Sequence, residues 1–308
     1  MIMHKQLKNL IPCEKGFLVS KILVTGANGF IGSALVLKLK AYGWNVFSVT
    51  SLEGDIADKK TLEKFLQQDI NHVIHLASKT FIPDSLIAPD IFYHTNVLGT
   101  VNILEFCRIN CIPLTYVSAY VYGRQDDLPI SEDAAIQPNN PYAMTKWLGE
   151  QICAFYAKNY NFSITTIRPF NVFGIGQSDN FLIPTIINQI FGDGTTIVVK
   201  DLMPKRDYIY LDDFLTALIA TIKKTEGYNV YNIGSGLSLS VKEIIDIIQT
   251  VVGTKKNIVS DNIARINEID DVVADIKKVT NDFGWQPSYS FREGIEIIIK
   301  SEISRRKK

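Results

Sequence analysis

Tyr142 and Lys146 have the types and the spacing that proton transfer to a substrate requires. They lie four residues apart in the segment PYAMTK, residues 141–146. On a helix such a pair shares one face, separated by about 6 Å of rise. A free tyrosine has a pKa of about 10, and a nearby ammonium favours the phenolate. The pair could therefore exchange a proton near neutral pH, although tyrosine–lysine pairs also occur on ordinary helix surfaces.

Ser118 is a second candidate, in the segment VSAYVYG of residues 117–123. It follows a run that predicts a strand, and the carboxyl ends of strands are where doubly wound sheets bind ligands. A hydroxyl there could hydrogen-bond a carbonyl oxygen. A serine with a structural role in a turn would fit the same pattern.

The segment TGANGFIG, residues 25–32, places three glycines between a predicted strand and a predicted helix. In a dinucleotide site, Gly26 would permit the tight turn, Gly29 the approach of a pyrophosphate and Gly32 the packing of the helix on the sheet. The free N–H groups and the dipole of the helix also favour phosphate. The loop indicates a dinucleotide, although small-residue turns between a strand and a helix are common.

Strands and helices alternate over the first two thirds of the chain. The pattern predicts strands at 21–25, 45–50, 72–76, 113–117 and 163–168, and helices at 33–42, 60–68, 92–109 and 141–159. This alternation predicts an α/β fold with a doubly wound parallel sheet, a Rossmann fold. Beyond residue 170 the pattern loosens, with helices expected at 182–191, 211–224 and 241–252 and strands at 206–210 and 230–233.

The composition excludes several classes of protein. Lys and Arg number 32, as do Asp and Glu, so the 308-residue chain lacks the basic excess of a nucleic-acid binder. No apolar run reaches the roughly 18 residues of a membrane span. Four cysteines without a CxxC pair, and no secretory signal, predict a cytoplasmic protein without a metal site. Residues 1–20 are expected to form an extension and 301–308 a basic tail.

The end of the second strand bears on the choice of cofactor. A dinucleotide site usually has an acid there, which binds the ribose 2′-hydroxyl of NAD. The segment Val49-Thr50-Ser51 holds no acid, and no Arg or Lys for a 2′-phosphate is evident. NAD and NADP both stay possible, and the missing acid slightly favours NADP.

Together, TGANGFIG, VSAYVYG and PYAMTK resemble, in this order, the extended short-chain dehydrogenase/reductases of the NAD-dependent epimerase/dehydratase group, which act on nucleotide sugars. Similarity continues from residue 21 to about 300. The further similar segments are GDI at 54–56, HLAS at 75–78, TNV at 95–97, RPFNVFG at 168–174, RDYIYLDD at 206–213, NIGSG at 232–236 and FGWQP at 283–287.

The resemblance implies a role for each candidate residue. Nicotinamide would exchange hydride with a sugar carbon, Tyr142 would carry the proton with its pKa lowered by Lys146, and Ser118 would hold the sugar oxygen. Cofactor contacts are expected from Gly26, Asn28, Gly29, Phe30, Ile31, Gly32, Asp55, Ile56, Leu76, Ala77, Ser78, Asn96, Tyr142, Lys146 and Pro169. Contacts with a nucleoside-diphosphate sugar are expected from Ser118, Tyr120, Asn171, Arg206 and Arg265, the two arginines holding the diphosphate.

Departures from the family pattern narrow the reaction. Ala119 and Tyr120 stand where 4,6-dehydratases have an Asp-Glu pair, and no Cys stands at 120 as in enzymes that epimerise C3 or C5. Residues 51–53 form a short connection that resembles 4-keto-6-deoxy-sugar-nucleotide reductases, as does GQSDNFLIP at 176–184, whereas typical 4-epimerases have a longer segment. A 4-keto reductase is favoured. A UDP-glucose 4-epimerase-like enzyme and a non-catalytic dinucleotide-binding protein, which would commonly lack the Tyr-Lys pair, are the alternatives.

The resemblance also implies a domain organisation. The Rossmann domain would comprise 21–170 and about 205–234, and the smaller mixed α/β nucleotide-sugar domain about 171–204 and 235–300. A homodimer is expected through the helices at 92–109 and 141–159.

Overall fold

Residues 21–222, 226–261 and 269–307 are described by the computed structural model, and the chain divides into two compact units. The first unit runs to Val121 and adds Pro138–Arg168 and Leu218–Tyr231. The second comprises Tyr122–Gln137, Pro169–Ala217 and the residues from Asn232 onward.

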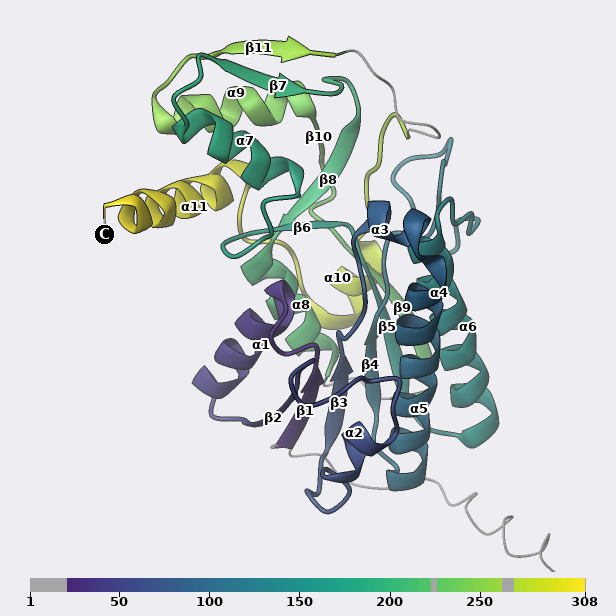
Figure 1. Cartoon of the computed structure of the whole chain (residues 1–308). Helices are drawn as coiled ribbons and strands as arrows, with labels where there is room; N and C mark the ends of the chain where they lie inside the picture. Colours follow the sequence, from purple (N-terminus) through teal and green to yellow (C-terminus); the bar gives the residue numbers. More distant parts are fainter. Residues whose placement is uncertain (1–20, 223–225, 262–268, 308) are drawn as a thin grey trace, which may run out of the picture. The chain divides into compact units, whose positions relative to one another are not determined.

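The first unit is built on a six-stranded parallel sheet with the strand order β2-β1-β3-β4-β5-β9 (Figure 1). The strands are β1 (Lys21–Thr25), β2 (Asn45–Val49), β3 (His72–His75), β4 (Leu114–Val117), β5 (Ile164–Pro169) and β9 (Tyr228–Ile233). The predicted doubly wound fold is thus confirmed. The order reverses at β1, because β2 lies on one side of it and β3 on the other. At such a point the connecting loops diverge and leave room for a ligand beyond the strand ends.

Helices cover both faces of this sheet. Helix α1 (Phe30–Ala41) lies against β1 and β2, and α5 (Gly99–Asn110) and α6 (Pro141–Tyr160) pack together on the opposite side (Figure 1). The predicted helix at 92–109 is in fact composed of α4 (Pro89–Phe92), the π-helix η2 (Tyr93–Leu98) and α5. The short helix α3 (Ile82–Ile87) was not predicted.

The predicted helix at 60–68 is shorter than expected. Only α2 (Lys60–Glu63) is α-helical. The N–H groups of Phe65, Leu66 and Gln68 bond to carbonyls three residues back, which is the tighter 3₁₀ pattern.

A buried core fixes α5 and α6 on the sheet. Its members come from four neighbouring strands and from both helices, and include Leu23, Val73, Leu114, Ile164, Ile103, Leu104, Cys107 and Cys153. Cys111, the fourth residue after Cys107, is exposed in a left-handed conformation at the end of α5, so the two cysteines are not buried together.

The second unit has two small sheets. One has the order β10-β8-β6 and the other the order β11-β7. The strands are β6 (Asn171–Phe173), β7 (Thr196–Val199), β8 (Lys205–Tyr210), β10 (Ser238–Ser240) and β11 (Asn257–Ser260). The helices are α7 (Leu182–Phe191), α9 (Val241–Val252), α10 (Lys277–Phe283) and α11 (Phe291–Arg306), and α8 (Leu211–Thr221) begins in this unit and ends in the first. In α9, Ile244, Ile245 and Ile248 are buried, as their spacing predicts.

The units differ from the expected domains chiefly at residues 122–137 and 205–217, which belong to the second unit and not to the first. Strand β8 pairs with β6 and β10, so 205–217 belongs to the second unit, whereas 218–231 belongs to the first. The assignment of cofactor binding to one unit and sugar binding to the other stays a prediction.

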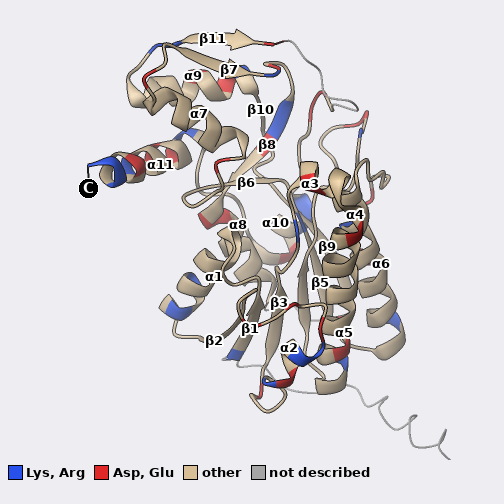
Figure 2. Ribbon diagram, in the orientation of Figure 1, with Lys and Arg blue, Asp and Glu red and all other residues tan. Residues whose placement is uncertain are grey.

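Charges of both signs are distributed along the described elements (Figure 2). Helix α11 illustrates this, because Arg292 pairs with Glu296 and Arg305 with Glu302. Among the described helices, none has both the length and the apolar character needed to cross a membrane.

Candidate active site

Two glycines of the loop, Gly26 and Gly32, lie too close to neighbouring backbone atoms to be replaced by residues with a side chain. Gly26 has a φ of +68° and its carbonyl accepts a hydrogen bond from Gly29 N at 3.0 Å. A Cβ atom on Gly32 would lie 2.1 Å from Gly26 O, and one on Gly26 would lie 2.8 Å from Ala77 N. The loop after β1 therefore lies directly against the loop after β3, at the reversal of strand order.

The start of α1 suits an anion. Gly29 caps the helix without a side-chain hydrogen bond, and no acidic residue occupies the first turn. The N–H groups of a first helical turn have no partner within the helix and attract phosphate. The loop thus fits the diphosphate of a dinucleotide, as the sequence predicts for Gly26, Gly29 and Gly32.

A carboxylate missed by the sequence analysis lies at the end of β2. Glu53 accepts a hydrogen bond from Thr50 N, and Glu53 N donates to Thr50 O at 3.1 Å. The hydrogen bonds from Thr50 lower the pKa of Glu53. In the same turn, Asn28 of the glycine loop donates to Ser51 Oγ at 3.3 Å. The Thr-x-x-Glu spacing, which allows the fourth side chain to fold back on the first N–H, was the available signal.

Asp55 and Ile56 differ in exposure although they are neighbours. Asp55 is exposed and accepts a hydrogen bond from Ala57 N at 2.9 Å. Ile56 is buried, and a Cβ on Gly99 of α5 would lie 2.6 Å from it. Ile56 therefore seats its loop on α5 while Asp55 faces solvent.

Asn96, a predicted cofactor contact, is only 1% exposed and bonds within the protein. Its amide oxygen accepts from Lys79 N at 2.8 Å, and its amide nitrogen donates to Lys79 O at 3.0 Å and to Thr145 Oγ1 at 2.9 Å. Asn96 thus holds the loop after β3, which carries Leu76, Ala77 and Ser78, beside α6.

A neutral histidine joins the ends of β1 and β3. His75 is bonded to Thr25 through Nδ1 at 2.7 Å and to Thr100 through Nε2 at 3.2 Å, and Ala77 N donates to Thr25 Oγ1 at 3.1 Å. Burial, and then the charge of Lys146, lower the pKa of His75 to about 3. The ring is therefore uncharged at neutral pH and acts as a fixed brace under the loops.

Helix α6 begins as the sequence predicts. The Asn140 side chain accepts a hydrogen bond from Ala143 N at 2.9 Å, and Pro141 occupies the first position. Tyr142 is partly buried in the first turn, and Lys146, one turn later, is 2% exposed. The Lys146 ammonium lies over the ring of Tyr116 in β4, with Nζ 4.6 Å from the ring centroid.

The contact between Lys146 and Tyr116 shows where Ser118 lies along α6. Residues 116 and 118 share one face of an extended chain, with Ser118 about 6–7 Å nearer the carboxyl end. A helix between parallel strands runs opposite to them, so Tyr142, one turn before Lys146, lies displaced in the same direction. The topology therefore brings Ser118 and Tyr142 to the same end of the sheet.

The hydroxyl of Ser118 is buried and has no hydrogen-bond partner in the structure. The Ser118 backbone is fixed, since its N–H donates to Ile167 O at 2.7 Å. A buried polar atom without a partner costs about 1–3 kcal/mol. Such an atom beyond a strand end indicates a position where a ligand completes the hydrogen bond.

Burial controls the titration of the pair on α6. It raises the pKa of Tyr142 above its usual range, so the expected lowering by Lys146 is not found in this state. Burial also lowers the pKa of Lys146 to about 8, with Cys153 and Glu150 acting in the opposite direction. At pH 7 the pair is thus a neutral phenol and an ammonium, and the phenol is a proton donor.

The predicted sugar-nucleotide residues are spread over the chain. Asn171 and Arg206 lie on the adjacent strands β6 and β8 of the second unit, where Asn171 Nδ2 donates to Asp207 O at 3.0 Å. Arg206 Nη1 donates to Lys205 O and Ile269 O, at 2.7 and 2.6 Å. Tyr120 is half-buried after β4, and Pro169 ends β5. Arg265 lies outside the described residues, and these roles stay predictions.

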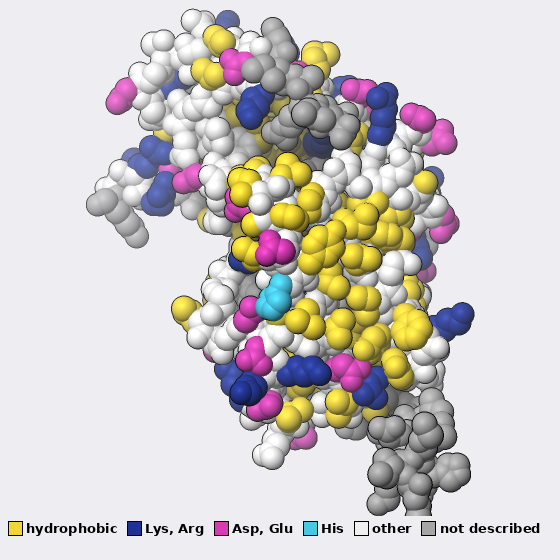
Figure 3. Space-filling view, turned by 45° about the vertical axis from the view of Figure 1, so that its right-hand side comes forward, with side chains coloured by type: hydrophobic (Ala, Val, Ile, Leu, Met, Phe, Trp, Pro, Cys, Tyr) yellow, Lys and Arg dark blue, Asp and Glu magenta, His cyan; other side chains and the backbone are white. Residues whose placement is uncertain are grey.

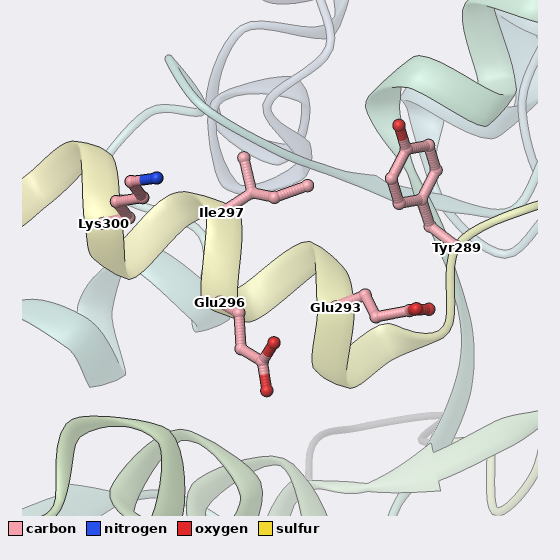
Figure 4. Close-up of a pocket in the computed structure, with 5 residues that line it drawn as sticks. All are labelled: Tyr289, Glu293, Glu296, Ile297 and Lys300. Carbon is pink, nitrogen blue, oxygen red and sulfur yellow. The ribbon is translucent and has the colours of Figure 1, made fainter.

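A surface hollow along α11 contains none of the predicted residues. It is lined by Tyr289, Glu293, Glu296, Ile297 and Lys300 (Figure 4). Glu293 forms a capping box with Ser290, and Glu296 pairs with Arg292. The two carboxylates of the hollow therefore already stabilise α11.

Comparison with known proteins identifies the family. A profile of the NAD dependent epimerase/dehydratase family matches residues 22–234. The chain belongs to this family. It is 32% identical over 300 residues to a putative UDP-glucose 4-epimerase of Methanocaldococcus jannaschii, covering 90% of this chain and 97% of the relative. It is 28% identical over 302 residues to GDP-6-deoxy-D-mannose reductase of Pseudomonas aeruginosa, covering 94% and 99%.

The same relationship appears in solved structures. That of RMD from Pseudomonas aeruginosa complexed with NADPH superimposes with a TM-score of 0.85 and 26% identity, over 93% of this chain and 99% of the other. The predicted family, the Rossmann fold and the NAD(P) cofactor are thus confirmed, and the chain belongs to a family of NAD(P)-dependent nucleotide-sugar epimerases and reductases.

Proposed function

We propose that this enzyme reduces the 4-keto group of a nucleoside-diphosphate 4-keto-6-deoxyhexose. The observation that carries the proposal is the short turn at residues 50–53. It joins β2, the edge strand of the sheet, to Gly54. Its length resembles the connection of 4-keto-6-deoxy-sugar-nucleotide reductases, whereas the resemblance implies a longer segment in typical 4-epimerases. The extensive match to GDP-6-deoxy-D-mannose reductase supports the same activity.

The residues present suit a reduction. A reduced nicotinamide, when bound, would supply the hydride that C4 of the sugar receives. Tyr142 gives its phenolic proton to the former keto oxygen, and Ser118 Oγ donates a hydrogen bond to that oxygen. The ammonium of Lys146 stabilises the phenolate that is left. The raised pKa of Tyr142 keeps the phenol protonated before the reaction, which is the form that a reduction consumes.

A panel assay tests the reaction. The purified protein is incubated with NADH or NADPH and with GDP-linked and dTDP-linked 4-keto-6-deoxyhexoses. We expect one reduced cofactor to be consumed for each sugar converted. No consumption with any member of the panel would reject the reductase.

A nucleotide-sugar 4-epimerase is the second candidate. It is favoured by the similarity to the putative UDP-glucose 4-epimerase. Catalytic interconversion of UDP-glucose and UDP-galactose without net change in nicotinamide would select it. Cofactor binding without turnover of either panel would instead indicate a non-catalytic dinucleotide-binding protein.

For the cofactor, we propose NAD rather than the NADP that the sequence slightly favours. Glu53 places a carboxylate at the end of β2, beside the turn that Asn28 of the glycine loop contacts through Ser51. A carboxylate there can bind ribose hydroxyls and would repel a 2′-phosphate. The positive charge of Lys64 contributes to the lowered pKa of Glu53. The same charge would attract a 2′-phosphate and so opposes the preference for NAD.

The preference is measured as dissociation constants for NADH and NADPH. We expect NADH to bind about 10-fold tighter, corresponding to about 1.4 kcal/mol. Glu53→Gln should reduce this ratio, whereas Glu63→Gln in the exposed part of α2 should leave it unchanged. Tighter binding of NADPH by the wild type would overturn the preference but not the proposed reaction.

We further propose a homodimer. Exposed hydrophobic side chains gather over α3, α4, η2 and α6 (Figure 3). They include Ile82, Leu86, Ile87, Ile91, Leu98 and Phe155, of which Ile87 is 83% exposed. A continuous apolar surface of this kind is typical of a protein interface. Sedimentation should show a dimer that dissociates when Ile87→Glu and Phe155→Glu are combined. A monomeric wild type would contradict the proposal.

A cytoplasmic location also stays a proposal.

A further inference from the structure

The Lys146 ammonium is buried against an aromatic ring. Tyr116 is completely buried in β4, and its ring centroid lies 4.6 Å from Lys146 Nζ. A buried charge is costly unless a partner stabilises it. The face of a tyrosine ring carries negative electrostatic potential and attracts an ammonium, most strongly where water is excluded.

The backbone of α6 is shaped to admit this ring. The Tyr116 hydroxyl donates to the carbonyl of Lys146 at 3.3 Å. A Cβ on Gly149 would lie 2.2 Å from the same hydroxyl oxygen, so any other residue at 149 would displace the ring or the helix. Tyr116 is therefore held against α6 both by a hydrogen bond and by a position that has no side chain.

The other titratable groups near Lys146 are either neutral or already paired, so they do not take the place of the Tyr116 ring in stabilising the ammonium. On α6 itself, Glu150 is bound to Arg168 at 2.7 Å, and burial raises the pKa of Cys153, so that thiol is neutral at pH 7. From β3, His75 is neutral, and Tyr142 is a neutral phenol.

We propose that Tyr116 is a positioning residue for catalysis, whose ring face holds the Lys146 ammonium one turn below Tyr142. Burial in β4 and the absence of a side chain at Gly149 hold the ring in place, and the electrons of the ring stabilise the charge. This inference rests on the proposed function for its kinetic test, because it assumes that Tyr142 and Lys146 serve proton transfer.

The direction of the effect follows from the charge. The ring favours the protonated form of Lys146. A ring whose face carries less negative potential therefore lowers the pH at which the ammonium loses its proton. Activity that requires the ammonium should then decline at a lower pH on the alkaline side.

The experiment replaces Tyr116 by Phe and by phenylalanines with one, two and three ring fluorines, which withdraw electrons with little change in volume. We expect Tyr116→Phe to keep the wild-type alkaline midpoint of kcat. Successive fluorines should lower that midpoint by about one pH unit in total, with the KM for the sugar nucleotide nearly constant. The same series at Phe106, a buried ring of α5, is the control and should leave the midpoint unchanged.

A second readout does not depend on turnover. The titration of isotopically labelled Lys146 by NMR should shift in the same order across the series. A flat series in this titration would show that the ring merely packs, and would overturn the inference. Shifts in the titration without turnover of any nucleotide sugar would instead reject the proposed function and leave the contact between Lys146 and Tyr116 established.

Discussion

Two buried polar sites, one in each unit, differ in how their polar groups are satisfied. In the second unit Asp207 is completely buried, and its oxygens accept four hydrogen bonds, from Ser235 N, Ser235 Oγ, Gly236 N and Ala274 N. In the first unit the Ser118 hydroxyl is buried without a partner, and the ammonium of Lys146 lies against a ring.

This difference distinguishes a group that stabilises the fold from groups that are available to a ligand. A saturated carboxylate such as Asp207 fixes two backbone segments, at 235–236 and at 274, to its own strand and has no capacity left for a ligand. Ser118 and Lys146 can still interact with a ligand. Their incomplete pairing lowers the stability of the free protein, and bound substrate and cofactor can offset this cost. The comparison predicts that changes at Asp207 affect folding, whereas changes at Ser118, Tyr142 and Lys146 affect turnover and leave folding unharmed.

Tyr142→Phe should have the largest effect. Removing the proton donor is expected to reduce kcat by about 10³–10⁴-fold, with the KM of the sugar nucleotide and the affinity for NADH little changed. Steady-state kinetics and cofactor titration measure both. Turnover close to that of the wild type would remove Tyr142 from the mechanism.

Asp207→Asn should act on stability. An amide NH₂ in place of one oxygen faces two N–H or O–H donors, so the free energy of unfolding should fall by roughly 3 kcal/mol. Urea unfolding measures the loss, with Asp246→Asn in an exposed pair on α9 as a control of little effect. If Asp207→Asn instead abolished turnover in a fully stable protein, the contrast between the Asp207 site and the Ser118 site would fail.

Ser118→Ala should lower kcat by about 10²-fold, because a hydrogen bond to the reacting oxygen is lost. Its stability should equal or exceed that of the wild type, since the substitution removes a buried hydroxyl that has no partner. Kinetics and thermal unfolding are compared on one preparation. A marked loss of stability would show that Ser118 has a structural role.

Lys146→Met should increase stability at neutral pH. The pKa of Lys146 is about 8 in the folded protein, against an ordinary value of 10.5, so the unfolded chain binds this proton more tightly. Below pH 8 the folded state bears the full penalty, and wild-type stability rises as the pH increases from 8 to 10.5. We expect Lys146→Met to be roughly 2 kcal/mol more stable at pH 7, with the gap closing toward pH 10.5.

The matched control is Lys158→Met on the exposed end of the same helix, where no buried charge is removed and stability should change little. A gap for Lys146→Met that is constant across this pH range would mean that the ammonium is not under strain in the folded state.

Features with local causes could be predicted from the sequence. The helices at 182–191 and 241–252 were predicted with the bounds that the structure has, because apolar spacing within one helix specifies them. The start of α6 follows from Asn140 and Pro141, and the glycine loop from a turn that needs a positive φ at Gly26. Strand, turn and helix here depend on neighbours a few residues away.

Other features depend on partners far apart in the chain, and only the tertiary structure decided them. Asn96 bonds Lys79 and Thr145, so its amide is used within the protein, and Arg206 bonds the carbonyl of Ile269. The seating of Lys146 on Tyr116 joins residues on a strand and a helix. No local pattern encodes such pairs, because they arise when burial brings distant segments together and each buried polar group must find a partner.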